Sequence, residues 1–264
     1  MSTVSDVIAF LEKFAPPALA EDWDNVGLLV GREAAEARQI MTCLTVTPDV
    51  ATEAVQQGIQ LIVSHHPVLF RAAKKITDAS SEGRMLLQLI ENGVAVYSPH
   101  TSFDSAELGI NQQLAESFGL SEVQPMRPHE HVEGLGSGRV GKLARRVPLT
   151  DFLGTVRSAV GSEYVEFSGS SDAPVLKVAV ACGAAAEFLT DAIRLGCDTF
   201  VTGEARFHSA LEARTEGINL ILLGHYSSER PAVEQLAKTL AVEFTDIEIF
   251  ASRSETDPLS VFVR

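Results

Sequence analysis

The stretch Leu61-Ile62-Val63-Ser64-His65-His66-Pro67 passes from strand-forming residues directly into two adjacent histidines. Its first four residues are typical of a strand, and Pro67 ends that strand because proline has no N–H for the ladder. Neighbouring side chains on a strand point to opposite faces, so His65 and His66 can converge only where the chain turns. Ligands bind at the carboxyl ends of strands in open α/β sheets, and imidazole is a common metal ligand. The stretch therefore predicts a metal site, with a pair of solvent-facing loop histidines as the alternative.

Strands and helices alternate on both sides of this stretch. Strand patterns cover residues 40–47 and 94–98, and helical patterns cover residues 48–58, 81–92 and 110–118. Such alternation is typical of a mostly parallel sheet covered by helices. We therefore expect an α/β fold in which the two histidines follow a strand of that sheet.

The pattern of the first half recurs in the second half. Residues 55–66 align with residues 193–204 without a gap, so that a glycine, a valine and a small hydroxyl residue coincide. With a second match in the same order, this predicts an internal duplication. We expect two similar three-layer α/β halves, residues 1–126 and 127–264, divided near the stretch 125–141, which is rich in proline and glycine. The halves would interlace, with a metal site in the crevice between them.

The second match is a histidine and a carboxylate four residues apart, just past a predicted strand. The two pairs are His100 with Asp104 and His225 with Glu229. A spacing of four puts both side chains on one face if a helix begins there. Helix capping is the alternative for Glu229, with Ser227 or Ser228 as the N-cap. Together with the histidine pair, these nitrogen and oxygen donors suit Zn, Mn, Fe, Co or Ni.

Composition narrows the classes of partner. The chain has 264 residues, of which 45% are hydrophobic, enough for a large core or two joined cores. Its net charge of −14 disfavours DNA or RNA binding, because phosphate neutralisation dominates that affinity. No apolar run approaches the roughly 20 residues that cross a bilayer, so no membrane association is expected. Three scattered cysteines without a CxxC pair indicate a reducing compartment, and we expect a cytoplasmic protein.

Five motifs carry a family resemblance that covers nearly the whole chain. They are Trp23-Asp24-Asn25-Val26-Gly27, Ser64-His65-His66-Pro67, His100-Thr101 with Asp104, Thr202-Gly203-Glu204 with His208, and Gly224-His225-Tyr226 with Glu229. In this order they resemble the NGG-interacting-factor-like family, whose members are often labelled GTP cyclohydrolase I type 2 homologues. The resemblance implies a toroidal homohexamer with two divalent metal ions per subunit. The implied metal ligands are His65, His66, Asp104, His225 and Glu229, and His100 is expected to lie behind them.

Two departures from the family pattern are visible. The usual His-Thr-Asn-Leu-Asp motif is here His100-Thr101-Ser102-Phe103-Asp104, which leaves the implied ligands intact. The family's loop of glycine and serine is here Cys182-Gly183-Ala184-Ala185-Ala186, which lacks a hydroxyl that could contact a substrate. This motif therefore gives no ground for assigning the family's substrate to this protein.

The expected activity follows from the ligand count. Five protein ligands for two ions leave coordination positions open to water, and water held there ionises near neutral pH. We expect a metal-dependent hydrolase acting on a small nucleotide-like or phosphorylated substrate, with GTP cyclohydrolase activity implied only by the resemblance. His100 or His208 would transfer protons, and Glu204 would act as a base. Arg71, Lys74 and Lys75 would hold a phosphate or simply face solvent.

Two other classes of function stay open at this point. The protein could bind or deliver the metal ion itself, or it could be a hexameric scaffold that the ions only brace. An open, water-accessible ion pair would favour hydrolysis, while complete coordination by protein ligands would favour the scaffold.

Overall fold

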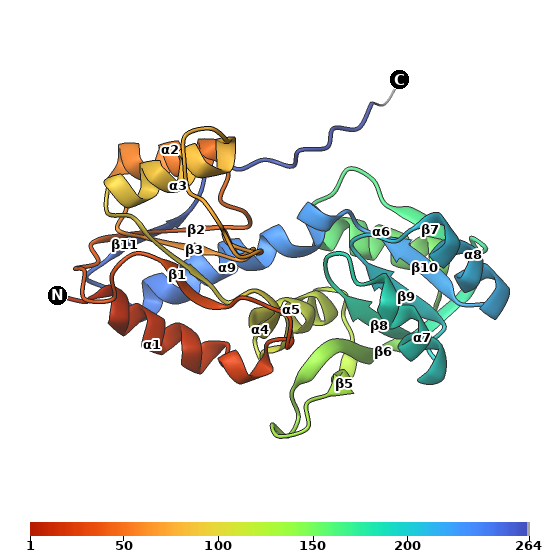
Figure 1. The fold of residues 1–264 in the computed structure, drawn as a ribbon. Helices are drawn as coiled ribbons and strands as arrows, with labels where there is room; N and C mark the ends of the chain where they lie inside the picture. Colours follow the sequence, from red (N-terminus) through yellow and green to blue (C-terminus); the bar gives the residue numbers. More distant parts are fainter. Residues whose placement is uncertain (263–264) are drawn as a thin grey trace. The chain divides into compact units, whose positions relative to one another are not determined.

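Two β-sheets, each flanked by helices, organise the computed structural model, which describes residues 1–262 (Figure 1). They belong to two units, one formed by Met1–Phe103 with the chain from Ala232 onward, the other by Asp104–Pro231. These bounds differ from the expected halves 1–126 and 127–264. One reason is that strand β11 (Glu248–Ala251) returns to pair in parallel with β2 (Gln39–Cys43) in the first unit. The other is that β5 (Ser121–Pro128) pairs with β6 (Gly136–Pro148) in the second unit.

The sheet of the first unit is mostly parallel, as expected. Its central strands pair in parallel, and only the edge strand β1 runs antiparallel to its neighbour. The strand order is β1 (Gly27–Val30), β4 (Ala95–Ser98), β3 (Leu61–Ser64), β2 and β11. Every residue of β3 and β4 is buried, which is typical of parallel strands covered on both faces.

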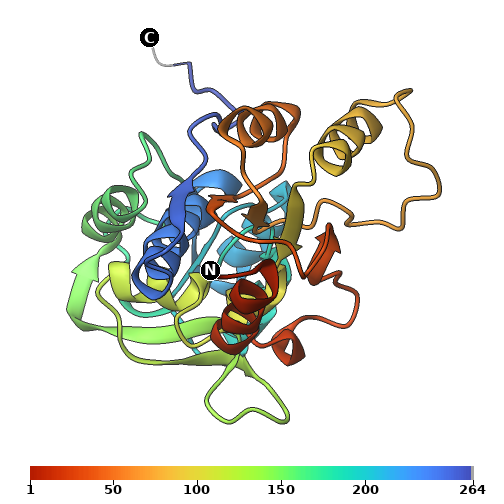
Figure 2. The ribbon, with the colours of Figure 1, turned by 90° about the vertical axis from the view of Figure 1, so that its left-hand side faces the viewer.

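Helices cover both faces of this sheet and make three layers. Helices α2 (Pro48–Gln57) and α3 (Ser81–Glu91) lie on one face, where Met41 and Ile62 pack with their residues. On the opposite face lie α1 (Val4–Phe14) and the second part of α9 (His225–Glu243) (Figure 2). There the Thr42 hydroxyl donates to the carbonyl of Val233, 3.0 Å away. Short helices η1 (Pro17–Leu19) and α4 (His100–Ser105) complete the elements around this unit.

The sheet of the second unit is mixed, which differs from the mostly parallel sheet expected. Strands β8, β9 and β10 pair in parallel, while β5, β6 and β7 pair antiparallel with their neighbours. The order is β5 (Ser121–Pro128), β6 (Gly136–Pro148), β8 (Pro174–Ala181), β9 (Thr199–Thr202), β10 (Asn219–Leu222) and β7 (Glu166–Ser168). The short connection 129–135 explains the antiparallel β5–β6 pair, because parallel strands need a longer crossover.

Helices also lie on both faces of the second sheet. One face packs Phe200 and Leu220 with residues of α7 (Leu189–Arg194) and α8 (Phe207–Glu216), which a short helix η2 (Ala186–Phe188) precedes. The remaining helices are α5 (Ile110–Ser117) and α6 (Leu149–Ala159), next to which Phe118 and Phe152 meet edge to face. Within residues 1–262, no helix is both long enough and apolar enough to span a membrane.

Candidate metal centre

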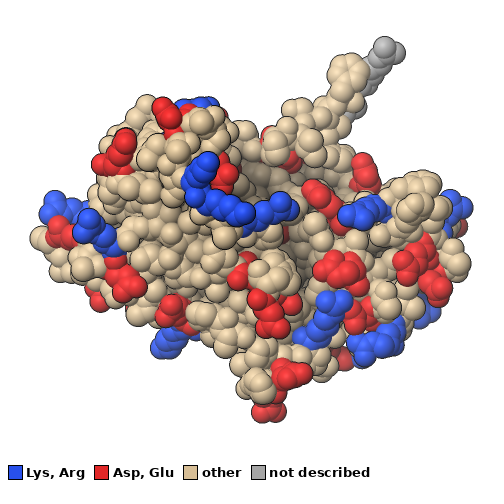
Figure 3. Space-filling view, viewed as in Figure 1, with Lys and Arg blue, Asp and Glu red and all other residues tan. Residues whose placement is uncertain are grey.

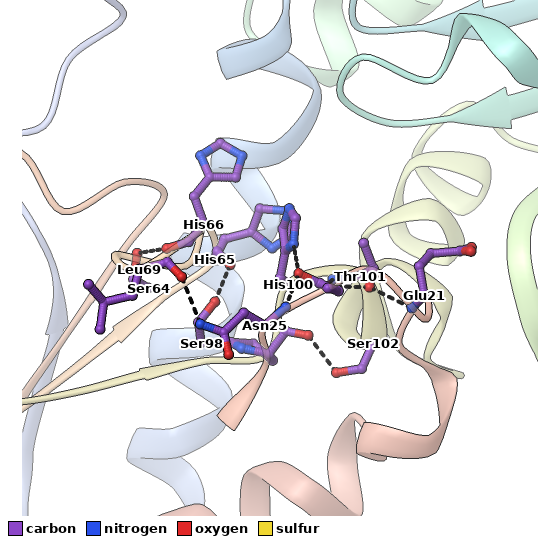
Figure 4. Close-up of polar contacts among 12 residues, drawn as sticks. Glu21, Asn25, Ser64, His65, His66, Leu69, Ser98, His100, Thr101 and Ser102 are labelled. Atoms are coloured by element: carbon purple, nitrogen blue, oxygen red, sulfur yellow. Dashed lines mark hydrogen bonds and ion pairs between the residues drawn. The ribbon is translucent and has the colours of Figure 1, made fainter. Parts of the chain in front are cut away.

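The turn after β3 brings the two adjacent histidines together. The N–H groups of His65 and His66 continue the ladder to the carbonyls of Cys43 and Leu44, at 2.9 and 2.8 Å. The Ser64 hydroxyl then donates to the carbonyl of His66 at 2.8 Å and bends the chain back on itself. The two imidazole rings lie 5.0 Å apart between centroids (Figure 4). The predicted convergence of the pair at the strand end is therefore present.

His100 joins this pair from the neighbouring strand. It follows β4 and begins α4 with a φ of +30°, a conformation that side chains other than glycine rarely adopt. Its ring lies 5.2 Å from the ring of His65, and one nitrogen of each of His65, His66 and His100 lies within 4.8 Å of the others. We expected His100 behind the ligands, but its position makes it a candidate ligand as well.

Asp24 holds His100 in place. Its Oδ1 atom accepts from Nδ1 of His100 at 2.7 Å, and its Oδ2 atom accepts from the N–H and hydroxyl of Thr101 at 3.1 and 2.5 Å. Burial raises the pKa of Asp24, but the hydrogen bonds from His100 and Thr101 outweigh burial and lower the pKa to about 2. Asp24 is therefore an anion that accepts from Nδ1 of His100, so Nε2 is the nitrogen of this ring that can act as a donor atom to a metal.

A second donor group lies in the other unit, where β10 leads into α9. This helix begins at His225, so Ser227 and Ser228 lie inside it and neither is the N-cap that the capping alternative requires. The Nε2 atom of His225 lies 3.1 Å from Oε2 of buried Glu229, and its Nδ1 atom lies 3.5 Å from Oε1 of half-exposed Glu204. The helix that the spacing of four requires begins at His225 itself and places Glu229 on the same face as the histidine.

The charge around His225 suits a cation. The hydrogen bond to Glu229 raises the pKa of His225, burial lowers it, and the charges of Glu229, Glu204 and Asp104 raise it further, to about 9. Three carboxylates thus act on one imidazole. A divalent ion would satisfy the same negative charge, so this donor set fits a metal ion.

Two glycines allow the backbone to approach the first turns of α9 closely. Gly183, which follows β8, has a φ of +64°, and a Cβ atom there would collide with the Glu229 carboxylate and lie 3.4 Å from Nε2 of His225. A Cβ atom at Gly203 would lie 2.7 Å from Oγ of Ser228. Ser228 accepts from the Gly183 N–H at 3.0 Å and donates to the His225 carbonyl at 2.8 Å. We call this close packing of Gly183 and Gly203 against Glu229 and Ser228 the cradle, and it needs glycine at both positions.

Asp104, near the end of α4, is fixed by residues to which the sequence pattern gave no role in the site. The Cys182 thiol donates to its Oδ1 atom at 3.1 Å, and the Asn111 amide donates to its carbonyl at 3.1 Å. Burial and the nearby Asp104 carboxylate raise the pKa of Cys182 well above its usual value, so the thiol is neutral. Buried Arg139 binds the carbonyls of Ser105 and Ala106 at 3.1 and 2.8 Å. Cys182 begins the loop that departs from the family pattern, whereas no local motif marks Asn111 or Arg139.

His208, another residue predicted for the site, lies apart from the donor group around His225. His208 is exposed on α8, where its ring meets that of Phe207 at 5.7 Å. Of the contacts that residues 1–262 make, none joins His208 to His225.

A cavity of about 310 Å³ opens beside His66 and is lined by side chains that include Thr45, Thr47, Val68 and Met85. Nδ1 of His66 lies 2.7 Å from the Thr45 hydroxyl.

Comparisons with known proteins agree with the motif pattern. A family model described as Duf34/NIF3 (NGG1p interacting factor 3) matches residues 2–258. A Clostridium perfringens protein named GTP cyclohydrolase 1 type 2 homolog is 31% identical over 256 residues, 97% of this chain and 98% of that protein. The protein NIF3 homolog of Schizosaccharomyces pombe is 31% identical over 268 residues, with 95% of each chain covered.

A solved structure shows the same fold. The hypothetical protein SA1388 of Staphylococcus aureus superposes with a TM-score of 0.89 at 28% sequence identity, covering 98% of this chain and 99% of that one. Sequence and structure thus agree over nearly the full length. The chain belongs to the DUF34/NIF3 (NGG1p interacting factor 3) family.

Proposed function

We propose that this protein binds two divalent metal ions and uses them to hydrolyse a small phosphorylated or nucleotide-like substrate. The observation that carries the proposal is the group of three imidazoles formed by His65, His66 and His100, with Asp24 behind it. A carboxylate that orients a histidine from behind is the usual arrangement in metal sites. Relatives named GTP cyclohydrolase 1 type 2 homolog support a hydrolytic reaction at the level of reaction class.

The proposed ligands are nitrogen and oxygen donors, which suit Zn, Mn, Fe, Co or Ni. They are His65, His66, Asp104, His225 and Glu229, with His100 as a further candidate. When bound, divalent ions supply Lewis acidity and an activated water. Glycine at positions 183 and 203 leaves room for the Glu229 carboxylate and for Ser228 beside it.

The remaining polar residues would bind substrate and move protons. Glu204 is half exposed beside His225, so its carboxylate is placed to accept a proton from water entering the site. Where His100 does not serve as a metal ligand, its Nε2 atom can take up a proton and release it, with Asp24 holding Nδ1. We propose a similar role for His208, which is exposed on α8. The cavity beside His66 offers space for a small molecule.

Metal analysis tests the first half of the proposal. The chain is loaded with excess Mn or Zn, freed of unbound metal and analysed for metal content, with the double variant His65→Ala/His225→Ala as the control. We expect two ions per chain in the parent and less than one in the variant. A parent that retains at most one ion after loading contradicts the two-ion site.

A substrate screen tests the second half. Loaded and chelator-stripped protein are compared on a panel of nucleotides and phosphoesters, and we expect turnover that appears only with metal. A protein that holds two ions, turns over nothing on the panel and passes its metal to an apo acceptor would instead be a metal carrier. Protein that holds its ions, transfers none and catalyses nothing would support the scaffold.

A further inference from the structure

Two large aromatic side chains are exposed beside His100. Trp23 is 62% exposed and Phe70 is 54% exposed, whereas the nearby aromatic residues Tyr97 and Phe103 are fully buried. The ring centroids of Trp23 and Phe70 lie 5.9 Å apart, and they lie 6.0 and 6.1 Å from the ring of His100. An apolar patch of this kind at the edge of a polar cluster marks a binding surface.

The aromatic pair is held in place by the backbone on either side. Asn25, two residues after Trp23, donates from its amide to the carbonyl of Leu69 at 2.7 Å, and Leu69 directly precedes Phe70 (Figure 4). Asp24, next to Trp23, is fixed by His100 and Thr101. The loop that carries Trp23 is therefore tied to the loop that carries Phe70. A surface ordered before binding loses less entropy when a ligand arrives.

Basic residues follow Phe70 on the same loop. Arg71, Lys74 and Lys75 are all exposed, and as far as the structure is described none of them forms an ion pair. In the face shown in Figure 3, a run of basic side chains lies over the segment between β3 and α3. In a chain with a net charge of −14, unpaired cations grouped on one loop attract an anion such as phosphate.

We propose that Trp23 and Phe70 form a stacking surface for a planar heteroaromatic ring, and that Arg71, Lys74 and Lys75 bind a phosphate on the same molecule. Aromatic faces bind planar rings such as nucleic-acid bases by stacking. The inference rests on the proposed function and narrows its substrate from phosphorylated compounds in general to nucleotides or similar heteroaromatic phosphates.

The single tryptophan of the chain makes the surface directly observable, because all tryptophan fluorescence comes from Trp23. Metal-stripped protein, which would turn nothing over, is titrated with GMP, guanosine and ribose 5-phosphate, with free tryptophan as the absorbance control. We expect saturable quenching by GMP, weaker saturable quenching by guanosine, and no change in emission with ribose 5-phosphate.

Two matched variants separate stacking from general effects. Phe70→Leu should weaken GMP binding by about 5- to 150-fold, the range of one ring-stacking contact. Phe167→Leu, which replaces a phenylalanine that is 46% exposed in the other unit, should leave GMP binding unchanged. The double variant Lys74→Gln/Lys75→Gln should weaken GMP binding and leave guanosine binding unchanged, since only GMP carries the phosphate.

The outcomes separate this inference from the proposed function. Absence of GMP quenching in a protein that still hydrolyses phosphoesters overturns the stacking surface alone. Quenching in a protein that hydrolyses nothing supports the surface and overturns the hydrolase. The stacking surface is also overturned if GMP and ribose 5-phosphate have equal effects on the emission. It is overturned as well if Trp23 emission changes only with protein concentration, because a second copy of the chain would then cover the ring pair.

Discussion

The Nδ1 atom of His100 lies 2.7 Å from Oδ1 of Asp24, although the two residues are 76 positions apart in the chain. The contact joins the loop before β1 to the start of α4, and it determines which nitrogen of His100 faces His65 and His66. Its effect on metal binding differs according to whether His100 is a metal ligand or a proton carrier. This difference leads to the first prediction.

Replacing Asp24 with asparagine tests the role of His100. If His100 is a ligand, Asp24→Asn should weaken metal binding by about 10- to 100-fold, because the carboxylate that orients the ring and raises its basicity is lost. The measurement is competition with a chelator, and Asp22→Asn, an exposed neighbour, is the control. Unchanged metal affinity with a lower turnover rate would show that His100 carries protons and does not bind metal.

The same carboxylate predicts a loss of stability in acid. The pKa of Asp24 is about 2 in the folded metal-free protein, against an ordinary value of 3.8 for an aspartate side chain. The contribution of Asp24 to the free energy of unfolding is therefore complete above about pH 4. It is lost as the pH falls from about 4 to about 2, and it amounts to about 2 kcal/mol. Urea unfolding of metal-free protein across this range should show a steeper loss of stability in the parent than in Asp24→Asn. Parallel curves would contradict the lowered pKa.

Glu229→Gln should lose metal while the fold remains. The neutral amide keeps the shape of the buried side chain but cannot neutralise a cation, and loss of one charged hydrogen bond to His225 costs less than about 3 kcal/mol. Metal content and melting temperature are measured on the same samples, with Glu243→Gln on the exposed part of α9 as the control. Metal retained at the parent level would exclude Glu229 as a ligand.

Gly183→Ala should disturb the site more than an equivalent change elsewhere. Gly183 and Gly196 have φ values of +64° and +68°, so alanine adds the same backbone strain of about 1–2 kcal/mol at either position. Only at Gly183 would the new Cβ atom meet Glu229 and His225, because nothing lies within 4 Å of it at Gly196. We expect both variants to melt lower and only Gly183→Ala to lose metal affinity. Equal metal affinity in the two variants would contradict the cradle.

The assembly implied by the family resemblance gives the last prediction. We expect light scattering at micromolar concentration to show six copies of the 28.4 kDa chain, since homo-oligomers usually close with point symmetry. Exposed apolar side chains such as Phe207 and Val242, at 73% and 81%, are available for such contacts. A mass of one chain that does not change on adding metal would contradict the hexamer.

The local features of the site were predictable because short-range geometry determines them. A proline after a run of strand residues ends β3, and the turn there brings His65 and His66 together as expected. A spacing of four aligns His225 with Glu229 because α9 begins at the histidine. Hydrophobic periodicity likewise indicated the α/β class and the parallel sheet of the first unit.

The features that only the tertiary structure decided are pairings between segments that lie far apart in the chain. β11 joins β2 from the far end of the chain, and β5 and β6 pair antiparallel across the stretch 125–141, where a boundary between halves was expected. Asp24 reaches His100, and Arg139 reaches the end of α4, through contacts that no local pattern encodes. The sequence by itself therefore determined which residues offer donor atoms, since this depends on residue type and spacing. Which side chains hold those donors in place depends on packing across the fold, because a buried polar group is satisfied by whichever partner the fold brings to it.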